Sequence, residues 1–169
     1  SWVRTRITMM CRITGLVVAA AMLVGAEGSG AAGKALLIEL PDGVLPAAVS
    51  SNLTVVGGLA TGGGFYWMPT TGVVYLGGIQ ALTVSRDGSA IAGEAFDNAR
   101  RENAAVWLRA AEWRPLGSIT PTAKPCDSAL SVALDSSADG KVLVGLAWDG
   151  CTIARAFRWE EATGMVNLG

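Results

Sequence analysis

The chain of 169 residues contains no histidine, and only 16% of its residues are charged. The absence of histidine excludes nucleophile activation by imidazole and removes the commonest neutral metal ligand. The sequence also has no glycine-rich phosphate loop with a lysine, no Cys-x-x-Cys and no Gly-x-Ser-x-Gly. We therefore assign no catalytic, cofactor-binding or metal-binding residue and expect no cofactor. A net charge of −1 argues against a nucleic-acid partner.

What the chain does contain is one pattern in three copies. In each copy a tryptophan stands ten residues before the glycine of a Leu-Gly pair, from Trp67 to Gly77, from Trp107 to Gly117 and from Trp159 to Gly169. An upstream half repeats at an offset of 52, pairing Ser85-Arg86-Asp87-Gly88 with Ser137-Ala138-Asp139-Gly140. Asp-Gly between two β-prone runs is a strong hairpin signal, because glycine accepts a positive φ. We interpret both aspartates as caps of their own turns.

Each unit contains four short β-prone segments, which in the second unit are 81–85, 90–95, 104–109 and 112–116. Units of about 40–50 residues with four strands are typical of β-propeller blades. The prediction is an all-β fold, a partial β-propeller of about three four-stranded blades, with repeats at 46–78, 79–118 and 119–169. Trp67, Trp107 and Trp159 are expected to pack between neighbouring sheets.

The consensus of the copies is Ala-x-x-Val/Ser-Ser-x-Asp-Gly, Val-Val-x-Gly, Ala-Phe-x-Trp, Thr-Gly and Val-x-Leu-Gly. Over residues 46–169 it resembles the HAF repeat, a family of extracellular bacterial repeat proteins. The third unit matches best, and the second departs at Glu112, where glycine is expected. The resemblance implies a propeller-like fold and export, and it implies no activity for particular residues.

The amino-terminal stretch reads as a targeting segment. Arg4, Arg6 and Arg12 precede an apolar run at 16–24, and Val24-Gly25-Ala26 fits a signal-peptidase site. We predict a signal helix within residues 1–26, of which residues 1–8 before Met9 are upstream sequence, and an uncleaved anchor is the open alternative. A linker at 27–34 and an extra strand at 35–45 follow. The expected location is extracellular, at the cell surface or periplasmic.

Two cysteines, Cys126 and Cys151, remain once the segment with Cys11 is removed. Cysteines in an exported chain usually pair, so we predict a disulfide between them. Closing this loop would stabilise the fold by roughly 3 kcal/mol. Two buried free thiols are the alternative.

Two loops carry the candidate ligand-binding residues. Asp97, Arg100, Arg101 and Glu102 form the densest charge cluster, in the loop between the second and third strands of the second unit. Trp148 and Asp149 occupy the matching loop of the third unit. Arginines can clamp a carboxylate or sulfate, and an aromatic beside a carboxylate can hold a sugar, although a solvated loop explains the same charges.

These observations favour an exported β-repeat scaffold or surface-binding module without catalytic activity, its partner a cell-surface glycan or protein. The alternative is a fragment of a propeller-type carbohydrate-active enzyme, a glycosidase or lyase, whose active site needs further blades. A membrane-anchored structural protein is a third option. Closed propellers have four to eight blades, so three units imply further blades of the same protein, a second copy, or an open arc.

Overall fold

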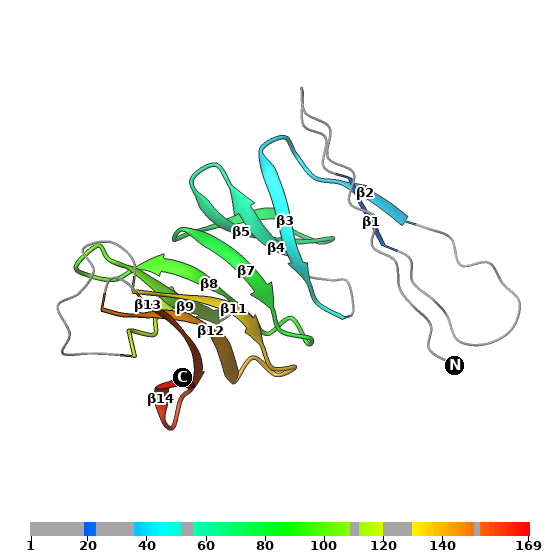
Figure 1. Ribbon diagram of the computed structural model, residues 1–169. Helices are drawn as coiled ribbons and strands as arrows, with labels where there is room; N and C mark the ends of the chain where they lie inside the picture. The colour runs from blue at the N-terminus through cyan, green and yellow to red at the C-terminus, as the bar shows by residue number, and fades with distance from the viewer. Residues whose placement is uncertain (1–18, 23–35, 52–55, 109–111, 120–129, 151–152) are drawn as a thin grey trace, which may run out of the picture. The chain divides into compact units, whose positions relative to one another are not determined.

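The computed structural model describes residues 19–22, 36–51, 56–108, 112–119, 130–150 and 153–169 (Figure 1). Every regular element in this part of the chain is a β-strand. The chain divides into two compact units, residues 1–45 and 46–169. Among the described residues, no helix is long and apolar enough to cross a membrane.

The first unit contains a two-stranded antiparallel sheet of β1 (Ala19–Met22) and β2 (Leu36–Glu39), with Ala19 opposite Glu39. The described part of the predicted signal helix is therefore a strand, and the rest of residues 1–26 and the linker at 27–34 lie outside the described residues. A short run of small apolar residues has no periodicity that separates helix from strand. The predicted extra strand at 35–45 contains β2 and then the Asp42-Gly43 turn, after which Val44 begins the next sheet.

Three four-stranded antiparallel sheets follow, each with its strands in chain order, and this confirms the predicted propeller-type architecture. We call them blade 1, blade 2 and blade 3. Blade 1 contains β3 (Val44–Val49), β4 (Val56–Ala60), β5 (Gly63–Met68) and β6 (Gly72–Gly77). Blade 2 contains β7 (Gln80–Val84), β8 (Ala90–Phe96), β9 (Glu102–Leu108) and β10 (Trp113–Pro115). Blade 3 contains β11 (Ser131–Ser136), β12 (Val142–Asp149), β13 (Ile153–Glu160) and β14 (Gly164–Asn167).

The turn between the first two strands of blades 2 and 3 is built around one aspartate. Asp87 Oδ1 accepts hydrogen bonds from Ser89 N at 2.9 Å and Ser85 Oγ at 2.7 Å. Asp139 Oδ1 accepts the equivalent bonds from Lys141 N and Ser137 Oγ. The glycine that follows each aspartate has a positive φ, 71° at Gly88 and 69° at Gly140. Asp-Gly thus supplies both the acceptor and the left-handed residue that this turn requires.

A bulge lies at the same place in the first strand of blades 2 and 3, between Ala81 and Thr83 and between Ala133 and Asp135. The neighbouring strand carries a glycine opposite the residue before the bulge, Gly145 in blade 3. A Cβ at Gly145 would lie 2.0 Å from the carbonyl oxygen of Val132. The repeated Val-Val-x-Gly pattern therefore follows from close approach of two backbones.

Blades 2 and 3 pack face to face around Trp159 of β13. This indole is 8% exposed and shares a buried cluster with Ala90, Ala92, Ala104 and Val106 of blade 2. Two residues earlier on the same face, Phe157 is fully buried in that cluster. The third strand of blade 3 thus directs its two aromatic residues towards the preceding blade.

Blades 1 and 2 meet in the same way. Trp107 packs against the buried Ala81, Val84 and Ile91 and lies 5.3 Å from the ring of Tyr66 in blade 1. Trp67 is half-buried, and because Tyr66 faces blade 2, the alternation of β5 puts Trp67 on the opposite face of blade 1.

Main-chain hydrogen bonds also join successive blades at equivalent turns. Ser51 N of blade 1 donates to Arg86 O of blade 2 at 2.9 Å, and Asp87 N of blade 2 donates to Ala138 O of blade 3 at 3.3 Å. Arg86 and Ala138 hold the same place in the repeat, since 138 − 86 is 52. In both contacts the acceptor is therefore the same position of the repeat in the following blade.

Candidate functional site

The strand connections of each blade fall on two opposite edges, because neighbouring strands are antiparallel. We call the edge with the connections from first to second and from third to fourth strand the first edge. The second edge carries the connections from second to third strand and from one blade to the next. The two edges present different side chains, and each contains a candidate site.

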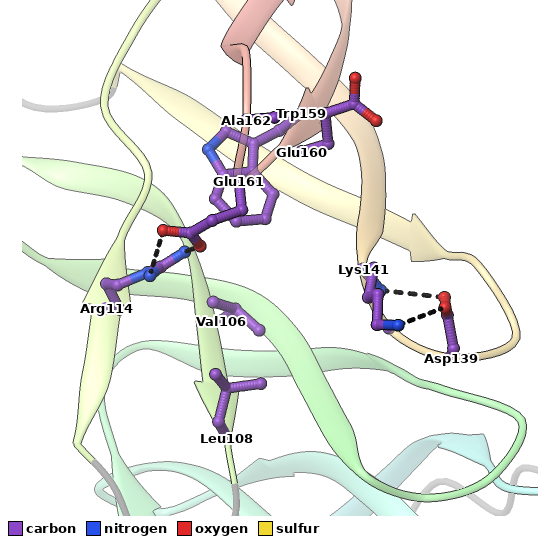
Figure 2. A pocket seen from close by; sticks show the side chains of 10 residues that line it. Val106, Leu108, Arg114, Asp139, Lys141, Trp159, Glu160, Glu161 and Ala162 are labelled. Atoms are coloured by element: carbon purple, nitrogen blue, oxygen red, sulfur yellow. Dashed lines mark hydrogen bonds and ion pairs between the residues drawn. The ribbon is translucent and has the colours of Figure 1, made fainter.

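A groove of about 450 Å³ opens at the first edge between blades 2 and 3. Val106 and Leu108 of β9 and Arg114 of β10 line it from blade 2. Figure 2 shows the opposite wall, which blade 3 supplies from its first turn and from the end of β13, with Asp139, Lys141, Trp159, Glu160, Glu161 and Ala162. The groove exists because the Trp159 cluster holds these two blades together.

The aromatic surface of the groove is already occupied. The guanidinium of Arg114 lies 5.1 Å from the centroid of the Trp159 ring. Arg114 also donates two hydrogen bonds to the two carboxylate oxygens of Glu161, which fixes it in this position (Figure 2). The hydrogen bonds from Arg114 lower the pKa of the Glu161 carboxyl. A sugar ring cannot stack on an indole face that a cation already covers.

The remaining charges at the groove are paired within blade 3. Lys141 Nζ lies 3.5 Å from Asp139 Oδ2, and Arg158 donates to Glu160 at 2.8 Å. That hydrogen bond from Arg158 lowers the pKa of the Glu160 carboxyl. Glu160 and Glu161 thus have different cationic partners, which agrees with their adjacent positions on opposite sides of the chain. The surface left for a ligand is apolar, with Leu108 46% exposed.

At the second edge, the predicted charge cluster forms a closed turn. Asp97 Oδ1 accepts hydrogen bonds from Ala99 N and Arg101 N at 2.9 Å, and Arg101 forms an ion pair with Asp97 Oδ2 at 2.8 Å. Burial raises the pKa of Asp97, but the hydrogen bonds from Arg101 and Ala99 outweigh it and the net pKa is lowered. Arg100 is exposed and has a positive φ of 59°. The Asp97 carboxylate is therefore occupied by hydrogen bonds and an ion pair within its own loop.

Glu102 and Trp148 are linked through one residue between blades 2 and 3. Leu130 N donates to Glu102 O at 2.8 Å, and Trp148 N donates to Leu130 O at 3.0 Å. Asp149 lies 3.8 Å from Arg155 in an ion pair. The structure thus places the two predicted loops on the same edge, with their main chains bridged by Leu130. Cys126 and Cys151, the predicted disulfide, lie outside the described residues.

Sequence reasoning missed Glu94 on β8. Gln80 Nε2 donates to Glu94 Oε2 at 2.7 Å, and Glu102 is a diagonal neighbour on β9. Burial raises the pKa of the Glu94 carboxyl, the hydrogen bond from Gln80 opposes this, and the charge of Glu102 raises it further. Glu94 is the one acid on a face of β8 that otherwise carries Ala90, Ala92 and Phe96, and that exception was the available signal. Arg114 and Glu161 were also missed, because they are 47 residues apart and meet only when two blades pack.

The fold defines the class of protein: an all-β repeat protein of the β-propeller type. A comparison with solved structures supports this, since the chain is similar to TolB from Acinetobacter baumannii, a β-propeller, with a TM-score of 0.57 and 16% identity. The similarity covers 90% of this chain but only 37% of TolB. No protein-family model and no curated protein matches the chain.

Proposed function

We propose that this chain is an exported, HAF-type binding module whose groove between blades 2 and 3 takes an apolar side chain from an extended peptide segment of a partner protein. One observation carries the proposal. The groove combines an exposed Leu108 and a buried tryptophan wall with charges that are already paired with one another. A ligand there gains from apolar burial and does not need to bring a countercharge.

A peptide fits this groove better than a glycan does. Sugar recognition requires an open aromatic face with unpaired polar groups around it, and Arg114 covers Trp159 while Glu161 holds Arg114. A peptide presents a single apolar side chain between polar backbone groups, which matches an apolar groove bordered by Lys141, Asp139 and Arg114. The surface-glycan option is therefore the less favoured partner.

The test is binding of capped twelve-residue peptides with leucine, phenylalanine or tryptophan at the centre, measured by fluorescence anisotropy beside a glycan array. Leu108→Asp should weaken peptide binding at least ~10-fold, because it puts a charge on the apolar wall. Leu59→Asp is the matched control, since Leu59 is 39% exposed on blade 1, away from the groove. Equal binding by the Leu108→Asp variant, or binding of glycans alone, would refute the assignment.

Export and the repeat type are part of the same proposal. Their support is the arginine-led apolar segment within residues 1–26 and the residue pattern of 46–169. Mass spectrometry of the protein secreted from a Gram-negative host should give an amino terminus at Glu27. An intact amino terminus in the membrane fraction would instead support the anchored structural protein.

A propeller-type carbohydrate-active enzyme is the second candidate, and the raised pKa of Glu94 is the observation that favours it. A carboxyl whose pKa is raised can act as a general acid, and Glu102 is a second carboxyl on the same face. Hydrolysis of polysaccharides that is lost in Glu94→Gln would establish this candidate over the binding module.

A further inference from the structure

The fourth strand of each blade is an edge of its sheet, and the three edges differ in how well they are protected. β10 is three residues long and contains Pro115, and β14 is four residues long. β6 is six residues long, with the sequence Gly-Val-Val-Tyr-Leu-Gly, and has no proline and no charged residue. Short strands, proline and charge are common protections of a sheet edge against a further strand. Blade 1 lacks all three at β6.

The repeat shows which main-chain groups of these strands point away from the sheet. Leu116 N donates to Ala104 O at 2.8 Å, and bonded and non-bonded pairs alternate along antiparallel strands. The residue before it, Pro115, therefore turns its main chain outward, at a place where no ladder hydrogen bond needs an N–H. Tyr75 holds the same position in blade 1, since 115 − 75 equals 107 − 67.

The hairpin of blade 1 gives the same alternation independently. Thr71 N donates to Met68 O at 3.2 Å, and Met68 pairs with the first residue of β6. Two residues further along β6, Val74 is again at a hydrogen-bonded position opposite β5. Val73 and Tyr75, on either side of Val74, therefore direct their N–H and C=O groups outward. Two residues with free donors and acceptors thus stand symmetrically about one residue that has none to offer.

The side chains leave this stretch of the edge accessible. Tyr75 is 61% exposed, more than any other large apolar side chain among the described residues. Trp113 of blade 2 meets β6 beyond the stretch, where its indole N–H donates to Leu76 O at 3.1 Å. A strand laid along Val73–Tyr75 would therefore find open main-chain groups beside a large ring that is still in solvent.

We propose that two copies of this chain pair antiparallel along β6, which joins their blade 1 sheets edge to edge. A two-fold axis through Val74 places Val73 of each copy opposite Tyr75 of the other, so each of these pairs exchanges both of its N–H···O=C hydrogen bonds. Each pair also sets a β-branched side chain against an aromatic ring, which is a favourable cross-strand combination. A second copy satisfies both edges in one contact, and this self-complementary contact closes as a dimer.

The first experiment is sedimentation equilibrium of the full chain over a wide concentration range, with variants checked for fold by far-UV circular dichroism. The wild type should form a weak, reversible dimer, because one strand pair buries less than the ~1,000 Å² of a stable interface. Tyr75→Pro gives blade 1 the residue that blade 2 has at position 115. It should weaken the dimer at least ~10-fold, because each copy loses a donor. Asn167→Pro is the matched control at the same position of β14 and should leave the dimer unchanged.

The second variant, Tyr75→Thr, separates the strand from the ring because it keeps the main-chain N–H. It should weaken the dimer less than Tyr75→Pro does, and an equal loss would overturn the proposal by making the ring the contact. A wild type that is monomeric at all concentrations would also overturn it, as would a dimer that Asn167→Pro weakens more than Tyr75→Pro does.

Amide hydrogen exchange of the wild type tests the same contact without a substitution. Protection of the Val73 and Tyr75 amides should rise with protein concentration, because only the dimer gives them acceptors. Protection that rises only on addition of a capped twelve-residue peptide of unrelated sequence would assign the edge to a foreign strand and overturn pairing between copies.

Discussion

Replacing Trp159 with alanine removes the largest side chain between blades 2 and 3. The indole is 8% exposed, so the substitution removes a ring whose surface is almost entirely buried in the cluster with Ala90, Ala92 and Val106. A buried tryptophan covers ~150–250 Å², which at ~25 cal/mol/Å² amounts to about 4–6 kcal/mol as an upper bound. We expect Trp159→Ala to lower the free energy of unfolding by about 3–5 kcal/mol. Trp107→Ala should cost less, because its ring is only half-buried.

Urea unfolding followed by far-UV circular dichroism and by the fluorescence of the other five tryptophans measures this loss. Repeats are stabilised through their contacts with neighbours, so blade 3 should unfold at a lower urea concentration than blades 1 and 2 in the variant. Trp159→Phe, which keeps an aromatic ring in the cluster, is the conservative control and should cost less than half as much. A loss below ~1 kcal/mol for Trp159→Ala, with a single unshifted transition, would refute the view that this indole holds the blades together.

Three further predictions concern the turns, the bulge and the cysteines. Gly145→Ala should destabilise the fold by about 1–3 kcal/mol, because its Cβ would overlap the carbonyl of Val132; an unchanged urea midpoint would contradict the close approach. The pKa of Asp87 is lowered from 3.8 to about 2 by hydrogen bonds from Ser89 and Ser85. The stabilisation from its carboxylate is therefore complete above pH ~4 and lost as the pH falls towards 2. Asp87→Asn should make the urea midpoint depend less on pH over that range. A variant whose midpoint falls with pH in parallel with that of the wild type would argue against the cap. Cys126 and Cys151 should resist alkylation until reduced, and rapid labelling of the native protein would show free thiols.

The blades could be predicted because their signals are local. The signal of Asp87-Gly88 and of its copy at 139–140 depends on the residues of a single turn. The alternation of apolar and polar residues around each tryptophan depends on a single strand. The second unit, expected at 81–85, 90–95, 104–109 and 112–116, is observed as β7 to β10, and every strand end lies within two residues of its expected position. The strand at Ala19–Met22 was not anticipated, because a short apolar run suits either a strand or a signal helix.

The groove could not be predicted, because it depends on how two blades face each other. Arg114 and Glu161 were each visible in the sequence, but their separation of 47 positions hides their pairing over Trp159. The cluster around Asp97 was chosen for its charge density. The structure places Asp97 and Arg101 in one turn, where their charged groups pair with each other. The paired charges and the buried indole, rather than the densest charge cluster, define the surface on which a partner can be sought.

The shared acceptor position at successive turns has a consequence for how such a chain can be lengthened. The main-chain N–H groups of Ser51 and Asp87 each donate a hydrogen bond to the carbonyl oxygen at the same repeat position of the following blade. A duplicated stretch of 52 residues inserted after blade 2 would meet a matching donor on one side and a matching acceptor on the other. At this main-chain contact, lengthening by whole blades is therefore open to tandem copying, while between the sheets the copy would bring Ala105 to the place where blade 3 brings Phe157.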